Sequence, residues 1–372
     1  MFNRQLAGGW RLVGPYYRGA LALTDWDTNG NPRRAYVAGS MDQSATHHIA
    51  EFFLPAPGAG TNPNSWPVVR PNRTIAPWWP SELPSVFGIY AYGLAWHQGK
   101  LWVSPRGFYD IRTPIQPLAL YPYGEAPIMV RDPRTNGPLL EKWGWGFVKH
   151  GRPGEFPYLG GGGYESGTTG PGLVSAGPTL AVPVNSGEAV TVLDYGQGYY
   201  ESPGASLEHW NKRCPRDPDY AIPQDGWLAW KPRERPDPAG MTGTKLEGRW
   251  CCDRIYGGGL VLPEGVCYWA LTGIGEVDYF WQRRGCYPDT FTQTGKNRLY
   301  VYDRSFEQDL SRRLQLLGWQ DFPLFDATPW LCGSSHCVAG QELGPDGAVY
   351  LSIRSAWASA QYRVDPAIGI WK

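Results

Sequence analysis

The sequence predicts an all-β protein, a five-bladed β-propeller, and three observations lead to this class. The 372 residues include 48 Gly and 35 Pro, which interrupt the chain too often for long helices. Hydrophobic residues make up 42% of the chain and charged residues 18%, which is enough apolar mass for a large core. A pattern of three short apolar strands also recurs five times, and such recurrence is typical of repeat architectures.

Each repeat has a Gly- or Ala-led apolar strand, a tight turn, a second apolar strand, a variable loop and a third strand. In the first repeat these strands are 19–24, 34–39 and 49–54. The five predicted blade cores are 19–54, 93–121, 172–193, 258–302 and 340–364. We interpret residues 1–372 as a single domain with long inter-blade loops. A sixth blade within 197–256 is the alternative.

The turns between the first and second strands support the repeat. Gly and Asn favour the left-handed positions of hairpin turns, so an X-Gly pair between two apolar runs indicates a hairpin. The turns of the five repeats are Asn29-Gly30-Asn31, Gln98-Gly99, Gly177-Pro178, Glu264-Gly265 and Asp346-Gly347. A sheet of three or four strands cannot bury both of its faces, and packing sheets around an axis solves this. The run Gly160–Gly163 is expected to be a flexible loop.

The last repeat ends close to the C-terminus, which leaves two segments that could supply its outermost strand. The segment 9–13 (GWRLV) could supply it, and the N-terminus would then close the ring. The alternative is that 366–372 supplies a short strand by itself. Closure by the N-terminal strand is the interpretation we favour.

Composition limits the partners and the compartment. Acidic and basic residues number 34 each, so net charge does not indicate a nucleic-acid surface, and no apolar run approaches the roughly 20 residues of a membrane helix. The N-terminal residues show no apolar signal core, yet we expect an extracellular or virion-associated protein. The seven cysteines could form local disulfides, Cys267 with Cys286 and Cys332 with Cys337, or could be buried free thiols.

Three stretches carry a resemblance beyond the general pattern. These are 93–109 (GLAWHQGKLWVSPRGFY), 257–279 (GGGLVLPEGVCYWALTGIGEVDY) and 298–303 (RLYVYD). They resemble a group of functionally uncharacterised β-propeller proteins. The resemblance implies the propeller fold and brings no activity and no catalytic residue with it.

Long, polar connecting segments are expected on one face of the propeller and short hairpins on the other. Binding residues usually lie on elaborated loops over a rigid scaffold, so the loop-rich face is the predicted site. Its candidate ligand-binding residues are His47, Arg106, Tyr109, Asp110, Glu165, Arg354 and Trp357. No metal site is predicted. Glu276 and Asp278 could perform acid and base work or bind calcium, or belong to a solvated loop.

The first functional expectation is a non-enzymatic recognition or structural propeller. It would present an aromatic, loop-rich face to a glycan or a protein partner, as in a virion or extracellular assembly, and homo-oligomers are compatible with it. The alternative is a carbohydrate-active enzyme with carboxylates at the central funnel. For a glycoside hydrolase, Asp25 and Glu342 on first strands are the candidate acids, besides Glu276 and Asp278. For a polysaccharide lyase the candidates are Tyr109, His47, Arg106 and Arg354.

Overall fold

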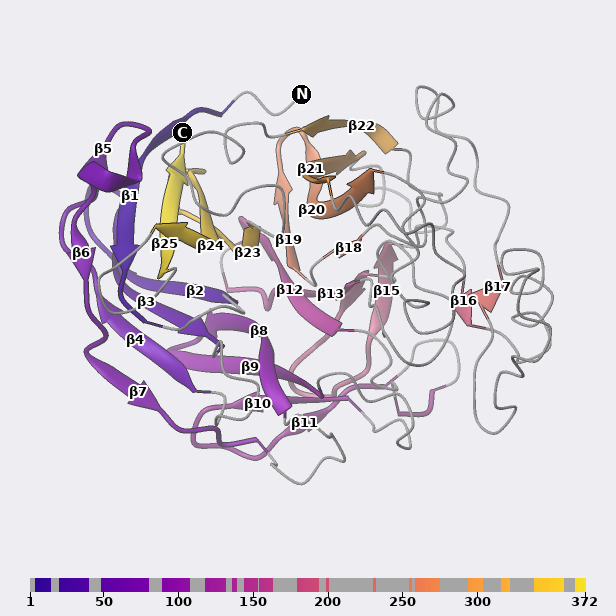
Figure 1. The fold of residues 1–372 in the computed structure, drawn as a ribbon. Coiled ribbons are helices and arrows are strands. Elements are labelled where there is room, and N and C mark those ends of the chain that lie inside the picture. Colours follow the sequence, from indigo (N-terminus) through magenta and orange to yellow (C-terminus); the bar gives the residue numbers. More distant parts are fainter. Residues whose placement is uncertain are drawn as a thin grey trace, which may run out of the picture.

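The structure, a computed structural model, describes seventeen stretches of the chain. They are 4–14, 20–39, 48–79, 89–107, 118–131, 136–138, 144–152, 154–162, 179–193, 199–200, 230–231, 254–255, 258–274, 294–303, 316–321, 338–357 and 365–372. These residues form β-strands and one short 3-10 helix, η1 (Pro63–Ser65). No helix within them is long and apolar enough to cross a membrane. The strands are arranged around a central axis as in a β-propeller (Figure 1).

The first sheet is an antiparallel run of four strands. They are β2 (Leu21–Trp26), β3 (Pro32–Ala38), β4 (Ile49–Phe53) and β7 (Arg73–Ile75), in this order across the sheet. The β2–β3 turn is held by Asp27, whose carboxylate accepts hydrogen bonds from the N–H groups of Asn29 and Asn31, each at 2.9 Å. Hydrogen bonding from Asn31 is the main cause of a pKa of Asp27 below its ordinary value. Gly30 supplies the left-handed position at φ 76°.

The second sheet repeats this arrangement with a tighter turn. Its strands are β8 (Ile89–His97), β9 (Lys100–Gly107), β10 (Ala119–Pro122) and β11 (Ile128–Met129). Gln98 and Gly99 form the β8–β9 turn at φ 48° and 76°, the two positive values that the favoured two-residue hairpin turn requires. The hairpin predicted from Gln98-Gly99 is therefore confirmed.

The third sheet has nine strands and consists of two antiparallel runs. One run holds β12 (Gly144–His150), β13 (Tyr158–Gly162), β14 (Thr179–Ala181) and β15 (Val190–Leu193). The other holds β19 (Gly258–Leu262), β20 (Gly265–Ile274), β21 (Thr294–Tyr302) and β22 (Leu316–Asp321), with β18 (Arg254–Ile255) beside β20. The first strands of the two runs, β12 and β19, pair in parallel from Phe147↔Gly258 to His150↔Val261. The sequence predicted a flexible loop at Gly160–Gly163, but Gly160 lies in strand β13.

The fourth sheet joins the two ends of the chain. It contains β23 (Val338–Leu343), β24 (Val349–Trp357), β25 (Asp365–Trp371), β1 (Leu6–Leu12) and β5 (Gly58–Ala59), with β6 (Val68–Val69) also paired to β1. The N-terminal strand β1 pairs antiparallel with β25, from Leu6↔Trp371 to Arg11↔Ala367. Both segments considered from the sequence are used, because β25 is the third strand of this sheet and β1 the fourth.

Strand pairing yields four large sheets and corrects the prediction of five or six blades. The difference arises at β12 and β19, because their parallel pairing fuses two runs into a single nine-stranded sheet. Gly258 permits this approach at φ 149°, where a β-carbon would lie 3.4 Å from the Phe147 carbonyl oxygen. Within 197–256, where a sixth blade was considered, the described strands are β16 (Tyr199–Tyr200) paired with β17 (Trp230–Lys231), and β18.

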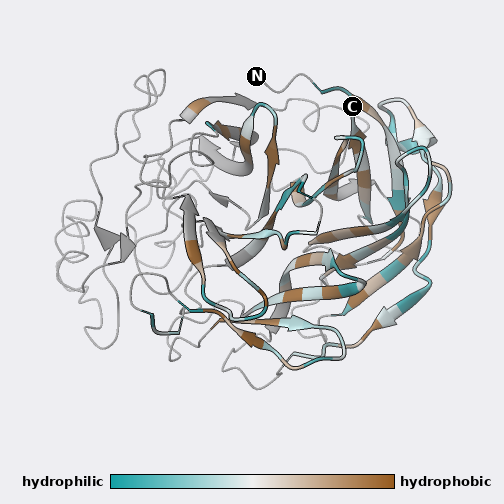
Figure 2. Cartoon of the chain, turned by 180° about the vertical axis from the view of Figure 1, so that it is seen from behind, coloured by the Kyte–Doolittle hydropathy of each residue, from teal (hydrophilic) through white to brown (hydrophobic). Residues whose placement is uncertain are grey.

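The apolar core lies between neighbouring sheets. One cluster contains Leu260 of β19 together with Leu351 of β24, and another contains Leu23 of β2 together with residues of the same fourth sheet. Tyr36 of β3 stacks on Trp96 of β8 with ring centroids 5.5 Å apart, which joins the first sheet to the second. Brown, hydrophobic segments accordingly recur on strands of the four large sheets in Figure 2. No sheet buries itself alone, and this is the physical reason for the radial arrangement.

Cys267 tests part of the disulfide interpretation. It is a free, buried thiol on β20, so the suggested bridge to Cys286 is not made. Burial raises the pKa of this thiol to about 12, which keeps it protonated and unreactive.

Candidate functional site

The innermost strands place one lysine and one glutamate at the propeller axis. Lys149 lies near the end of β12 and Glu342 near the end of β23, and their side chains are only 6% and 10% exposed. Lys149 Nζ donates to Glu342 Oε2 at 2.7 Å and to the Leu21 carbonyl oxygen of β2 at 3.3 Å. We call Lys149 and Glu342 the axial pair. It joins three inner strands that are far apart in the sequence.

The carboxylate of the axial pair is held by the backbone as well. The N–H of Leu23 donates to Glu342 Oε2 at 3.3 Å, and the N–H of Leu343 donates to Oε1 at 3.2 Å. A cation and hydrogen-bond donors thus replace the water that burial removes from this carboxylate. The neighbouring Gln341 donates to the Gly258 carbonyl oxygen at 2.8 Å, while its buried Oε1 has no hydrogen-bond partner among the described residues.

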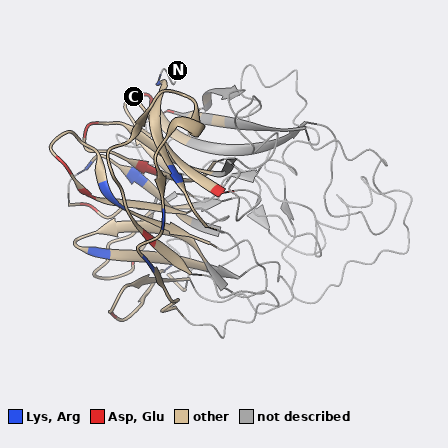
Figure 3. Ribbon diagram, turned by 60° about the vertical axis from the view of Figure 1, so that its left-hand side comes forward, with Lys and Arg blue, Asp and Glu red and all other residues tan. Residues whose placement is uncertain are grey.

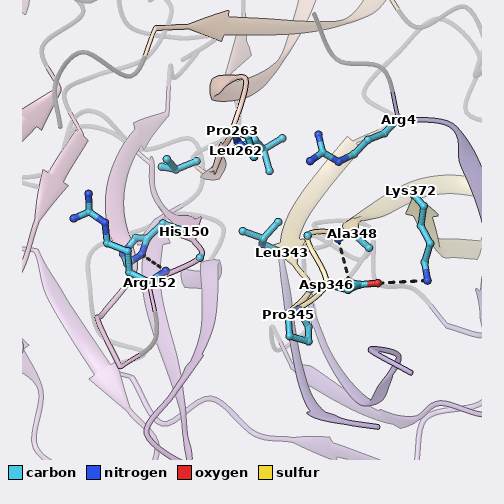
Figure 4. A pocket seen from close by; sticks show the side chains of 14 residues that line it. Arg4, His150, Arg152, Leu262, Pro263, Leu343, Pro345, Asp346, Ala348 and Lys372 are labelled. Carbon is cyan, nitrogen blue, oxygen red and sulfur yellow. Dashed lines mark hydrogen bonds and ion pairs between the residues drawn. The ribbon is translucent and has the colours of Figure 1, made fainter. Parts of the chain in front are cut away.

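A cavity of about 590 Å³ opens at the hairpin end of the same strands. The turns after β12, β19 and β23 line it, together with Arg4 and the C-terminal Lys372 (Figure 4). Its residues are Arg4, His150, Gly151, Arg152, Val261, Leu262, Pro263, Leu343, Gly344, Pro345, Asp346, Gly347, Ala348 and Lys372. We call it the hairpin-face pocket. It lies on the side where the sequence predicted only short turns.

The chain links the pocket directly to the axial pair. His150 follows Lys149 and Leu343 follows Glu342, and both His150 and Leu343 line the pocket. His150 is fixed at both nitrogens: Nε2 donates to the Phe156 carbonyl oxygen at 3.0 Å, and Nδ1 accepts from the Arg152 N–H at 3.3 Å. The pocket wall therefore includes the residues that directly follow both members of the axial pair in the chain.

Of the two funnel carboxylates considered from the sequence, only Glu342 belongs to the axial pair. Asp25, at the end of β2, is 47% exposed and its Oδ2 lies 2.9 Å from Arg34 Nε of β3. Its positive φ of 57° turns the chain into the hairpin. Asp25 and Glu342 are thus held in different ion pairs.

The structure places three of the other candidates by backbone position. Arg106 lies on β9 opposite Tyr90, Arg354 lies on β24, and Trp357 pairs with Asp365 of β25. The remaining candidates, His47, Tyr109, Asp110, Glu165, Glu276 and Asp278, lie outside the described residues.

Glu51 on β4 is a second buried carboxylate. Its oxygens accept hydrogen bonds from Arg34 at 3.1 Å, from Tyr36 at 3.0 Å and from Arg73 at 2.6 Å. Burial by itself would raise the pKa of Glu51, but the hydrogen bonds, that from Arg73 foremost, outweigh it and the pKa lies below its ordinary value. Glu51 therefore ties β3, β4 and the start of β7 together.

Metal ligation has no support in the described part of the chain. Among those residues, no group of three or more His, Cys, Asp or Glu side chains could hold a metal ion. The calcium alternative rests on Glu276 and Asp278 and stays a prediction.

Comparisons with known proteins concern the fold. The sequence matches no protein-family model and no curated protein. A candidate glycoside hydrolase of Parabacteroides distasonis is similar in structure at 10% identity and TM-score 0.42, over 99% of this chain and 92% of that one. A candidate glycosidase of Bacteroides thetaiotaomicron is similar in structure at 9% identity and TM-score 0.44, over 98% of this chain and 86% of that one.

A third similar structure comes from the GH130 family of mannoside phosphorylases, which contains glycoside hydrolases that target β-1,2 mannosidic linkages in Candida mannan. It matches at 8% identity and TM-score 0.47, over all of this chain and 95% of that one. All three are described as enzymes or candidate enzymes that act on glycosides, in contrast to the non-enzymatic recognition or structural propeller expected from the sequence. At such identities and TM-scores no residue role can be transferred, and the function must be argued from this chain's own side chains.

Proposed function

We propose that this protein is a carbohydrate-active enzyme that cleaves glycosidic bonds, with Glu342 of the axial pair as a catalytic carboxylate. The observation that carries the proposal is a buried carboxylate on an innermost strand, held beside a buried lysine where β2, β12 and β23 meet. Buried charges cost stability unless they are compensated, so a buried ion pair is a weak device for stability alone.

The chemistry of the axial pair suits one half of a glycosidase mechanism. Cleavage of a glycosidic bond needs two groups: a carboxyl group that protonates the leaving oxygen, and a carboxylate that activates water or attacks as the nucleophile. Lys149 Nζ donates to Glu342 Oε2 at 2.7 Å, which holds the carboxylate in place. We propose that Glu342 acts as the base or nucleophile and that another residue is the acid.

The second carboxylate must come from another part of the chain. Asp25 is engaged by Arg34, and this leaves Glu276 and Asp278, which follow β20 in the sequence. We propose that one of these two supplies the acid. The pair would need to lie roughly 5 to 10 Å apart, the range that covers retaining and inverting mechanisms.

The test is glycoside turnover by the purified chain. Aryl α- and β-glycosides of neutral and acidic hexoses and a set of polysaccharides are assayed for aglycone and reducing-end release, with and without inorganic phosphate. Glu342→Gln keeps the shape of the side chain and removes its charge, so we expect kcat to fall by about 10² to 10⁴. Glu51→Gln is the matched control, because it alters a buried, ion-paired carboxylate outside the axial pair, and it should keep kcat within a few-fold.

Two outcomes would overturn the proposal. One is full turnover by Glu342→Gln, and the other is the absence of turnover across the whole panel in both buffers. Circular dichroism and the melting temperature of each variant separate loss of chemistry from loss of folding.

A further inference from the structure

Two aromatic side chains stay exposed at the outer part of the first and second sheets. Phe53 of β4 is 52% exposed, and Tyr123, in the turn between β10 and β11, is 50% exposed. The two sheets are neighbours and share one core cluster (Figure 1). Exposed rings that are grouped on one surface are typical of binding sites.

The Tyr123 ring is fixed by its neighbours. Its N–H donates to the Leu101 carbonyl oxygen at 2.9 Å, and its ring meets Trp78 edge to face, with centroids 4.8 Å apart. Trp78 Nε1 donates to the Tyr121 carbonyl oxygen at 3.2 Å, and the Trp78 ring packs on buried Trp79 at 5.2 Å. A ring that is already fixed loses little conformational entropy when a ligand binds.

Phe53 lies beside a group of paired charges. Arg34 Cζ is 5.3 Å from the Phe53 ring centroid, and Arg34 is ion-paired with Asp25. Buried Glu51 is ion-paired with both Arg34 and Arg73. The Arg73 side chain is 56% exposed, so hydrogen-bond donors reach the surface next to the exposed ring.

Contacts link the surroundings of Phe53 to those of Tyr123. Glu51 and Phe53 are alternate residues of β4, so their side chains point to the same face of the first sheet. Hydrogen bonding to Glu51 is the main cause of a raised pKa of Arg73, and Tyr123 contributes to it as well. The chain that leaves β7 after Arg73 brings Trp78 onto Tyr123. We call this surface the rim strip; it consists of Arg34, Phe53, Arg73, Trp78 and Tyr123.

The charges of the rim strip are balanced, and this limits the kind of ligand. Its two arginines are neutralised by Asp25 and Glu51. Lys and Arg positions are likewise interspersed with Asp and Glu positions along the described strands (Figure 3). A charged ligand therefore gains little attraction here. A neutral sugar can pack its C–H groups on an aromatic ring and exchange hydrogen bonds between its hydroxyl groups and side chains that are already ion-paired.

We propose that the rim strip is a second glycan-binding site, which holds a neutral polysaccharide outside the proposed catalytic centre. The rings of Phe53 and Tyr123 pack on sugar units, and Arg73 donates to hydroxyl groups. For the class of ligand the inference rests on the proposed function, and it narrows that class. Glu342 lies on an innermost strand and the rim strip on outer strands, so a ligand that uses both is a polymer.

Affinity electrophoresis of the full chain tests the proposal, in gels that contain mannan, mixed-linkage β-glucan, xylan or dextran. Polygalacturonate is the acidic comparison. The Glu342→Gln variant is run beside the parent, so that turnover does not consume the polysaccharide. We expect at least one neutral polysaccharide to retard both proteins, and polygalacturonate to retard them less.

Variants assign the binding to the rim strip. Phe53→Ser and Tyr123→Ser should each weaken it about three- to tenfold, because each removes one ring, and the double variant should weaken it about tenfold or more. Tyr123→Phe keeps the ring and should bind as the parent does. Leu317→Ser is the matched control, because Leu317 is 58% exposed on β22 and lies outside the rim strip.

The proposal is wrong if no neutral polysaccharide retards the parent, if polygalacturonate is bound more tightly, or if Leu317→Ser loses as much affinity as Tyr123→Ser. Self-association of the parent that Tyr123→Ser abolishes, measured by size-exclusion chromatography, would assign the surface to a second copy of the chain and also overturn it. Thermal unfolding of the variants separates lost binding from lost folding.

The two proposals fail in different ways. A chain that shows no turnover but loses polysaccharide binding in Tyr123→Ser keeps the rim strip and removes the catalytic proposal. Turnover that depends on Glu342, with unchanged polysaccharide affinity in both serine variants, does the reverse.

Discussion

Lys149 and Glu342 are the residues on which the proposed chemistry depends, and their burial makes them a sensitive point for stability too. Each is at most 10% exposed, and each is the charged partner of the other. Removing one partner of a buried pair leaves an uncompensated charge, which costs about 3 to 5 kcal/mol. Replacing both by apolar residues is often neutral.

Lys149→Met is therefore expected to lower the free energy of unfolding by about 3 kcal/mol or more. The double variant Lys149→Met/Glu342→Leu should recover most of that loss. Urea unfolding followed by tryptophan fluorescence measures both. A single variant as stable as the parent would show that the pair is hydrated and is not the buried site described.

The hydrogen bonds of Glu51 predict how the stability of the protein depends on pH in the acid range. Its pKa is lowered in the folded protein, so the folded state binds protons less readily than the unfolded chain does, and the resulting stability is present above the ordinary glutamate pKa of about 4.3. It is lost as the pH falls through the folded-state value. Glu51→Gln should cost about 1 to 3 kcal/mol at pH 7 and flatten the decline of stability between about pH 5 and pH 3.

The measurement is urea unfolding of parent and Glu51→Gln at half-unit steps of pH. The two stability curves should converge as the pH falls. Parallel curves over that interval would contradict the role given to the hydrogen bonds from Arg73 and Tyr36.

Among the elements, β1 depends most on glycine for its place. At Gly9 a β-carbon would lie 2.1 Å from the Ile368 carbonyl oxygen and 2.6 Å from the Trp66 ring. The backbone of β1 can approach both β25 and the η1 segment only because no side chain is present.

Gly9→Ala should therefore lower the free energy of unfolding by about 2 kcal/mol or more, since overpacking typically costs about 1 to 3 kcal/mol and here the obstacle is backbone. Gly151→Ala is the control, because its nearest foreign atom, Leu343 Cδ2, is 3.9 Å away. Thermal and urea unfolding should show a clearly lower stability for Gly9→Ala than for Gly151→Ala. Equal stabilities would contradict the close packing of β1.

At the scale of the whole molecule, closure of the fourth sheet by both chain ends makes the ring depend on its first residues. Trp10 and Leu12 are fully buried, and each such side chain contributes roughly 1.5 to 3 kcal/mol. Deleting residues 1–12 should lower stability by roughly 3 to 6 kcal/mol and expose the edge of β25, which promotes association.

Calorimetry and size-exclusion chromatography of the truncated chain test this prediction. We expect a lower melting temperature and self-association that the intact chain does not show. An unchanged melting temperature would mean that β1 is an accessory strand.

Local residue patterns predicted much of the fold. The turns at Gly30, Gly99, Gly265 and Gly347 all separate paired strands, because a positive φ is a local demand that glycine reveals directly. The fused sheet was not predicted, since parallel pairing of β12 with β19 is a long-range contact without a sequence signature. Strands β12 and β13, which precede the predicted third blade core, were not predicted because their glycines interrupt the apolar pattern.

The sequence by itself determined which segments form strands and where the hairpins turn, because both follow from apolar runs and from the conformational freedom of glycine. It also indicated that the N-terminal strand completes the last sheet. Only the tertiary structure decided that Lys149 meets Glu342, 193 positions later, and that three hairpins and the two chain ends line the hairpin-face pocket. Such contacts depend on how the sheets pack around the axis, and no local pattern encodes that geometry.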